Sequence, residues 1–125
     1  MRKLVSHFSL IGVGAALVTG LAAAGCGSGE DAPADAKRMS FTLTDAGCEP
    51  NQAKAPSGPI VFEVENTGTS KVTEFEVMEG DEVLGEVENL SDGLSGNFSL
   101  TLEPGDYTLY CPGGSDERGS LRVTS

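Results

Sequence analysis

The sequence has 125 residues and a formal net charge of −11, with 19 acidic side chains against eight basic ones. A negative field of this size disfavours nucleic acids and anionic lipid headgroups as partners and favours cations. The single histidine is His7, so the chain beyond it has no imidazole for a metal site, a general base or a Ser-His-Asp triad.

The first 25 residues are typical of an export signal. Arg2 and Lys3 form a positive start, and residues 8–24 are apolar or small and carry no charge. This stretch is shorter than a membrane-spanning helix requires. The sequence Leu-Ala-Ala-Ala-Gly-Cys at 21–26 resembles a bacterial lipobox, which implies cleavage before Cys26 and its lipidation. The alternative is an ordinary signal peptide that is followed by a cysteine.

Residues 26–38 follow the signal and are predicted to be a flexible tether. They are rich in Gly, Ser, Ala, Pro and acidic residues, and they hold almost nothing that could be buried. A lipid on Cys26 would then hold the protein on the extracytoplasmic face of the cell membrane.

Residues 39–125 are predicted to be one all-β domain. Apolar side chains alternate with polar ones at a period of two, and Gly, Pro, Asn and Asp clusters separate the runs. Short strands at this spacing indicate an antiparallel Greek-key β-sandwich of about seven strands. We expect these strands at residues 39–44, 59–66, 71–79, 82–88, 95–103, 106–111 and 119–124.

The segment Leu-Glu-Pro-Gly-Asp-Tyr at 102–107 resembles a tyrosine corner. In that motif a tyrosine hydroxyl bonds a nearby backbone group and fixes a crossover between strands. Tyr107 is therefore expected to have a structural role.

Several segments in order resemble a cupredoxin-like domain. They are Cys-Glu-Pro at 48–50, Gly-Pro-Ile-Val-Phe at 58–62, Glu-Phe-Glu at 74–76, Glu-Asn-Leu at 88–90, and Pro-Gly-Asp-Tyr leading to Cys111. The resemblance is to the variety that begins the periplasmic component of the EfeUOB iron-uptake system. It spans residues 39–124, and the helical domain of that component is not in this sequence.

The resemblance implies a metal site near one end of the sandwich, for an iron or copper ion. Its ligands would be Cys48, Glu74, Asp106 and Cys111, with Asp106 standing where the family more often has Glu. Glu76 is the next candidate, and Glu86, Glu88 and Asp116 follow as weaker ones. Five residues of extended chain span about 16 Å, so Asp106 and Cys111 reach one ion only if the strand bends.

Cys48 and Cys111 also admit a different interpretation. They are the two cysteines left if Cys26 is lipidated, and an even pair in an oxidising compartment commonly forms a disulfide. Oxidised sulfur is a poor metal ligand, so a disulfide and a thiolate site exclude each other in one redox state. Type 1 copper is not expected in either case, because such a site needs two histidines.

These observations predict a non-enzymatic, surface-tethered cupredoxin-like protein that binds or relays iron or copper in uptake or homeostasis. Its partners would be iron-uptake or other envelope proteins, and its lipid would bind the membrane. The alternative is a metal-free β-sandwich, closed by a disulfide, that serves as an interaction module of the cell envelope.

Overall fold

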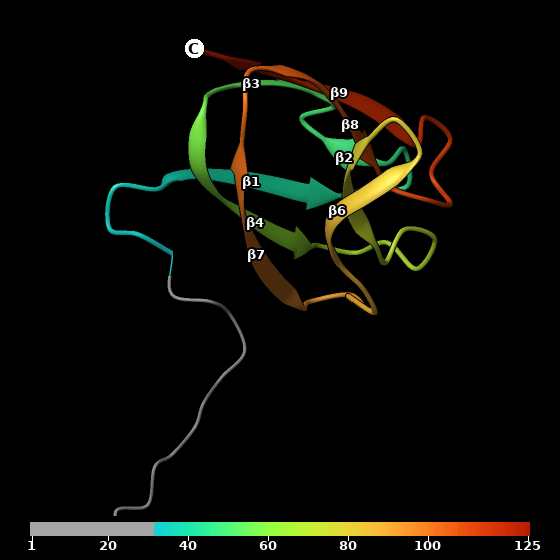
Figure 1. The fold of residues 1–125 in the computed structure, drawn as a ribbon. Helices are drawn as coiled ribbons and strands as arrows, with labels where there is room; N and C mark the ends of the chain where they lie inside the picture. The colour runs from blue at the N-terminus through green and yellow to red at the C-terminus, as the bar shows by residue number, and fades with distance from the viewer. Residues whose placement is uncertain (1–31) are drawn as a thin grey trace, which may run out of the picture.

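A computed structural model describes residues 32–125, which form nine β-strands (Figure 1). Their bounds are β1 Lys37–Leu43, β2 Cys48–Glu49, β3 Gln52–Pro56, β4 Gly58–Asn66, β5 Phe75–Glu79, β6 Glu82–Val87, β7 Ser95–Leu102, β8 Gly105–Tyr110 and β9 Arg118–Thr124. The predicted all-β sandwich is confirmed. No helix in residues 32–125 has the length and apolar character needed to cross a membrane.

The strands form two sheets that pack face to face. The four-stranded sheet has the order β2-β1-β4-β7, and the five-stranded sheet has the order β3-β9-β8-β5-β6. The expectation of a purely antiparallel sandwich is wrong, because β1 runs parallel to β4 and β3 runs parallel to β9. Each parallel pair joins strands that are not consecutive in the chain. Alternation of apolar and polar residues is a local signal, so it does not reveal such pairings.

Two of the nine strands were not anticipated, and one, β5, is much shorter than predicted. β2 has two residues, and β3 holds only Gln, Ala, Lys, Ala and Pro, so neither carries an alternating apolar signal. The strand expected at 71–79 begins only at Phe75, because residues 67–74 form a loop. This loop carries Glu74.

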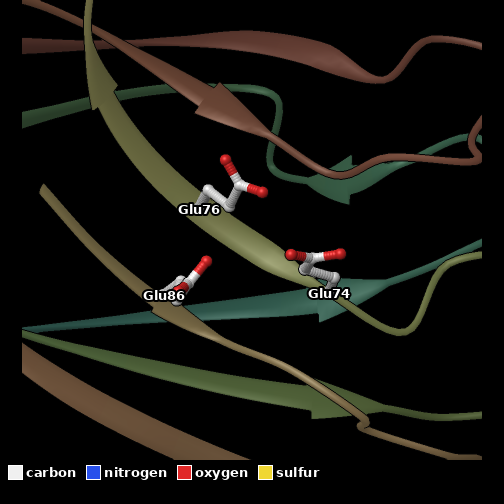
Figure 2. Close-up of side chains that lie close together, drawn as sticks. All are labelled: Glu74, Glu76 and Glu86. Atoms are coloured by element: carbon white, nitrogen blue, oxygen red, sulfur yellow. The ribbon is translucent and has the colours of Figure 1, made fainter. Parts of the chain in front are cut away.

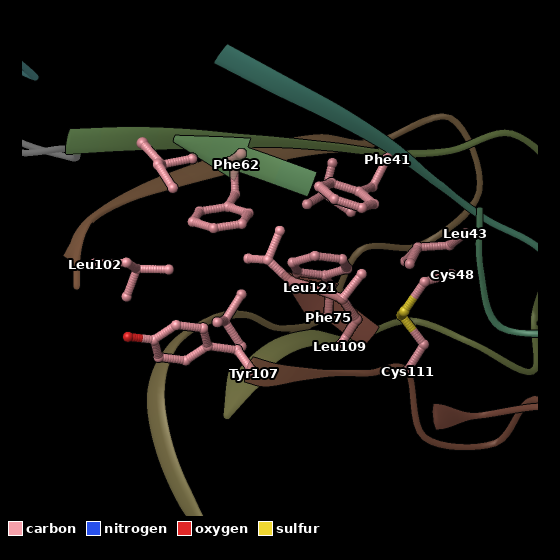
Figure 3. Close-up of a cluster of buried hydrophobic side chains, with 14 of the residues drawn as sticks. Phe41, Leu43, Cys48, Phe62, Phe75, Leu102, Tyr107, Leu109, Cys111 and Leu121 are labelled. Atoms are coloured by element: carbon pink, nitrogen blue, oxygen red, sulfur yellow. A yellow bond between two sulfur atoms is a disulfide. The ribbon is translucent and has the colours of Figure 1, made fainter. Parts of the chain in front are cut away.

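The core lies between the two sheets (Figure 3). Phe41 and Phe62 come from the four-stranded sheet and meet Phe75 of the other sheet, with ring centroids 4.8 and 6.2 Å from that of Phe75. At one end, the Tyr107 hydroxyl donates a hydrogen bond to the Glu103 carbonyl oxygen at 2.8 Å. The structural role predicted for Tyr107 is thus confirmed.

The predicted signal and the lipidation of Cys26 lie outside the described residues, as does most of the predicted tether. Within the described part, β1 begins at Lys37, so Lys37 and Arg38 belong to a strand and not to a tether. Arg38 also forms an ion pair with Glu63, which links the start of β1 to the neighbouring strand β4.

Candidate metal centre

Cys48 and Cys111 are joined in a disulfide, with their Cα atoms 5.6 Å apart. Cys48 lies in β2 and Cys111 directly follows β8, so the bond links the two sheets. Both residues are buried against the core (Figure 3). Of the two interpretations of this pair, the structure holds the disulfide, and a bonded sulfur offers no thiolate to a metal.

Asp106 lies near the start of β8, where it forms an ion pair with Arg122. The Arg122 guanidinium of β9 donates to both of its carboxylate oxygens, at 2.5 and 2.7 Å. This pairing raises the pKa of Arg122 further above its usual value. β8 separates Asp106 from Cys111 along its length, so the structure does not bring Asp106 to the cysteines.

Glu74 instead meets two other glutamates over β5 and β6. Carboxylate oxygens of Glu74, Glu76 and Glu86 all lie within 4.8 Å of one another (Figure 2). We call these three residues the glutamate trio. Glu74 precedes β5, Glu76 lies in β5, and Glu86 lies opposite Glu76 in β6.

The position of Glu74 depends on Asn66, the last residue of β4. The Asn66 side chain is fully buried and its amide donates to the carbonyl oxygens of Thr69 and Leu90, at 2.9 and 2.7 Å. Its oxygen accepts from the backbone N–H groups of Gly68 and Thr69, both at 3.0 Å. One side chain therefore holds the loop between β4 and β5 against the loop after β6.

Thr69 extends this network to the loop between β1 and β2. Its hydroxyl donates to Asp45 at 2.6 Å and accepts from the backbone N–H of Lys71 at 3.0 Å. The bond from Thr69, followed by the charge of Lys71, lowers the pKa of Asp45. Next to Glu74, the Thr73 carbonyl oxygen accepts a hydrogen bond from the Leu90 N–H at 2.9 Å. The backbone beside Glu74 is therefore held to the loop after β6.

Glu76 faces outward from the sheet, since its neighbours Phe75 and Val77 are fully buried in the core. Its own exposed fraction is nevertheless only 8%. Burial raises the pKa of Glu76 to about 7, helped by a hydrogen bond to Glu74 and by the charges of Glu74, Glu86 and Glu88. The ion pairs found in residues 32–125 leave the trio without a basic partner.

The spacing of the trio is compatible with a bound cation. Around an ion with oxygens at about 2.1–2.5 Å, two ligand oxygens lie no more than about 4–5 Å apart, which is close to the observed spacing. Carboxylate oxygens suit hard ions. A cation would also offset the repulsion from Glu74, Glu86 and Glu88, which adds to the effect of burial on the pKa of Glu76.

Comparison with known proteins identifies the family. The model of the cupredoxin-like domain family matches residues 14–123. The chain belongs to the cupredoxin-like family.

The curated relatives of this cupredoxin-like chain include iron-uptake components. It is 35% identical over 91 residues to the iron uptake system component EfeO of Yersinia pestis, covering 73% of this chain and 24% of that protein. The corresponding protein of Escherichia coli strain K12 is 32% identical over 90 residues, covering 72% and 24%. The chain thus spans about a quarter of the length of these relatives.

Solved structures share the cupredoxin architecture at lower identity. Reduced auracyanin from Roseiflexus castenholzii matches with a TM-score of 0.62 at 14% identity, over 72% of this chain and 98% of auracyanin. The metal-binding domain of the Cu(I)-exporting ATPase CopA of Streptococcus pneumoniae matches with a TM-score of 0.58 at 15% identity, over 78% and 94%. These likenesses support the fold alone.

The cupredoxin-like domain also has a surface cavity lined by carboxylates. A cavity of about 370 Å³ on the outer face of the four-stranded sheet is lined in part by Glu63 and Glu65. Glu63 is already paired with Arg38 and accepts from the Ser40 hydroxyl. The trio is therefore the stronger candidate for a cation.

Sequence reasoning ranked Glu76 and Glu86 below Glu74, and a β-bulge explains why Glu86 in particular was not expected beside them. The β5–β6 hairpin pairs Met78 with Val83, but the next pair is Val77 with Gly85, so the register shifts by one residue. Without the shift Glu76 would face Gly85, and Glu86 would point to the other face of the sheet. The Glu-Phe-Glu alternation places Glu74 and Glu76 on one face, and the short hairpin places β6 beside them. The bulge that brings Glu86 to the same face has no signature in the sequence.

Proposed function

We propose that this domain binds an iron ion at the glutamate trio and serves in iron uptake or homeostasis in the cell envelope. The observation that carries the proposal is the convergence of three carboxylates, one of them buried, with no basic partner among the described residues. The relatives named as iron uptake system components support the choice of iron. With the sulfurs of Cys48 and Cys111 joined in a disulfide, the trio itself offers hard carboxylate oxygens, which favours iron over Cu(I).

The domain is proposed to bind and relay the ion without catalysing a reaction. Glu86 is exposed and Glu74 is half-buried, so the ion would be reached from solvent and could pass to another protein. Other iron-uptake components of the envelope are the proposed recipients or donors.

Calorimetric titration with Fe²⁺ under anaerobic conditions, without reductant, tests the site. We expect one ion per domain, and Glu76→Gln to weaken the affinity by about tenfold or more, because one charged ligand is lost. Glu65→Gln is the matched control, since Glu65 lies exposed on the other sheet, and it should bind as the wild type does. Equal affinity in wild type and Glu76→Gln would overturn the assignment.

The disulfide favours a second candidate function. A sandwich closed by Cys48–Cys111 and free of metal would serve as an interaction module that binds another envelope protein. The Fe²⁺ titration, with a second titration of the reduced domain with Cu(I), separates the two, because a module of this kind binds neither ion. A Cu(I) site that appears only after reduction would instead restore the cysteines as ligands.

We further propose that a lipid on Cys26 tethers the domain to the extracytoplasmic face of the cell membrane. The support is the resemblance of residues 21–26 to a lipobox. Cys26→Ala should leave the protein unprocessed or release it from membranes, as seen by fractionation and by mobility on a gel. A variant that is processed and sediments as the wild type does would refute the anchor.

A further inference from the structure

Four outward side chains form one row across the five-stranded sheet, and the glutamate trio lies at one end of it. The strand register places Arg118 of β9 opposite Tyr110 of β8, Tyr110 opposite Glu76 of β5, and Glu76 opposite Glu86 of β6. Tyr110 points outward because Leu109 and Cys111 on either side of it are fully buried. Its ring therefore stands between a guanidinium and the trio.

Arg118 is held by this ring. Its guanidinium carbon lies 4.5 Å from the centroid of the Tyr110 ring, which is a cation–π contact. Arg118 and Glu76 are two strand spacings apart, about 10 Å, and their long side chains together could span that separation. In the stacked position the guanidinium is not among the groups that form ion pairs within residues 32–125.

A second arginine on β9 shows what happens without an aromatic neighbour. Arg122 points to the same face as Arg118, but the residue opposite it in β8 is Asp106, and the two form an ion pair. Each outward arginine of β9 thus interacts with the β8 residue opposite it, Arg118 with Tyr110 and Arg122 with Asp106.

We propose that Tyr110 is a positioning residue that occupies Arg118 and so keeps Glu76 unpaired and available to a cation. This inference rests on the proposed cation site at the trio. If the ring were absent, Arg118 would pair with Glu76, and an arriving ion would have to break that pair before it could bind.

Fe²⁺ titration of four variants tests the inference. We expect Tyr110→Ala to weaken binding about fivefold, as the strength of a partly exposed ion pair implies. Tyr110→Phe keeps the ring and should stay within about twofold of wild type. The double variant Tyr110→Ala/Arg118→Ala should recover wild-type affinity. Thr108→Ala, at the next outward position of β8, is the matched control.

The recovery in the double variant separates this role from a merely structural one, because removing a second side chain would not repair a damaged sheet. Unchanged binding in Tyr110→Ala, or a loss that persists without Arg118, overturns the inference. If Glu76→Gln also leaves binding unchanged, the proposed function has failed; if Glu76→Gln alone weakens binding, only the role of Tyr110 has failed.

A measurement without metal gives an independent check. A crystal structure of metal-free Tyr110→Ala should show a guanidinium nitrogen of Arg118 within 4 Å of a Glu76 oxygen. An Arg118 side chain that stays away from Glu76 when the ring is gone would overturn the inference whatever the titrations show.

Discussion

At the scale of single residues, two of the three buried polar side chains in residues 32–125 distinguish this domain from a plain β-sandwich. Asn66 is fully buried, and its amide group satisfies two carbonyl oxygens and two N–H groups. Glu76 is nearly as buried but has two carboxylates close to it and no basic partner within residues 32–125. The first arrangement stabilises the fold, whereas the second costs stability that a bound cation would return.

The pH dependence of stability should reveal Glu76. The folded domain holds the Glu76 proton more tightly than the unfolded chain, since the pKa is raised to about 7. This contribution is complete below the ordinary carboxyl pKa and is lost as the pH rises through about 7. The groups facing Glu76 are Glu74, Glu86 and Glu88, with the Tyr110 ring between it and Arg118.

We therefore expect metal-free Glu76→Gln to gain stability over wild type as the pH is raised from 5 to about 8. Urea unfolding at a series of pH values measures the difference. Glu65→Gln should show no such trend, and a difference for Glu76→Gln that is constant with pH would contradict the prediction.

Asn66→Asp tests the buried amide. A carboxylate cannot donate to the Thr69 and Leu90 carbonyl oxygens, and it would place a charge at a site with 0% exposure. We expect a loss of about 3 kcal/mol or more in the free energy of unfolding. Asn97→Asp, at an exposed position of β7, should change it by less than about 0.5 kcal/mol. Equal effects of the two substitutions in chemical denaturation would refute the role of Asn66.

At the scale of elements, the β5–β6 hairpin determines both the site and the packing at one end of the sandwich. It turns at Gly80, which has a positive φ of 59°. The bulge between Val77 and Met78 then brings Glu86 to the face of Glu76 and turns Gly85 inward. A Cβ on Gly85 would lie 2.7 Å from the ring of Phe98.

Gly85→Ala should accordingly destabilise the domain. The Phe98 ring has little room to move, because its centroid lies 5.0 Å from that of Phe62 and 6.0 Å from that of Phe75. We expect a cost of about 1–3 kcal/mol from overpacking, measured by thermal or urea unfolding. Gly105→Ala is the matched control, since a Cβ there makes only an ordinary contact at 3.7 Å with the Tyr107 ring. A Gly85→Ala domain as stable as Gly105→Ala would contradict this account.

At the scale of the whole molecule, a small core is supported by one covalent link. The disulfide joins residues 63 apart in sequence and ties β2 of one sheet to the end of β8 in the other. Domains of this size bury a modest fraction of their surface, so a constraint on the unfolded chain is a large part of net stability.

Removing the disulfide should lower the free energy of unfolding by about 4 kcal/mol, the value that loop entropy gives for a loop of this length. Urea unfolding of the oxidised and the reduced wild type measures it. Cys48→Ala/Cys111→Ala should resemble the reduced protein and should not respond to reductant. Coincident curves for oxidised and reduced wild type would show that the bond contributes nothing.

The sequence by itself determined the class of fold and named Glu74 among the candidate ligands. Alternation at a period of two reveals which side chains of a strand share a face, and it located seven strands from local information. The resemblance to the cupredoxin-like family singled out Glu74 and the two cysteines as candidate metal ligands. The lack of histidine beyond His7 removed type 1 copper from consideration.

Only the tertiary structure decided which of these residues meet. It joined Cys48 to Cys111 in a disulfide and paired Asp106 with Arg122 in an ion pair. A one-residue shift in the β5–β6 register then placed Glu86 beside Glu76. The physical reason is that periodicity fixes the face of each strand separately, whereas partners across strands depend on register, bulges and parallel pairings set by packing of the whole core.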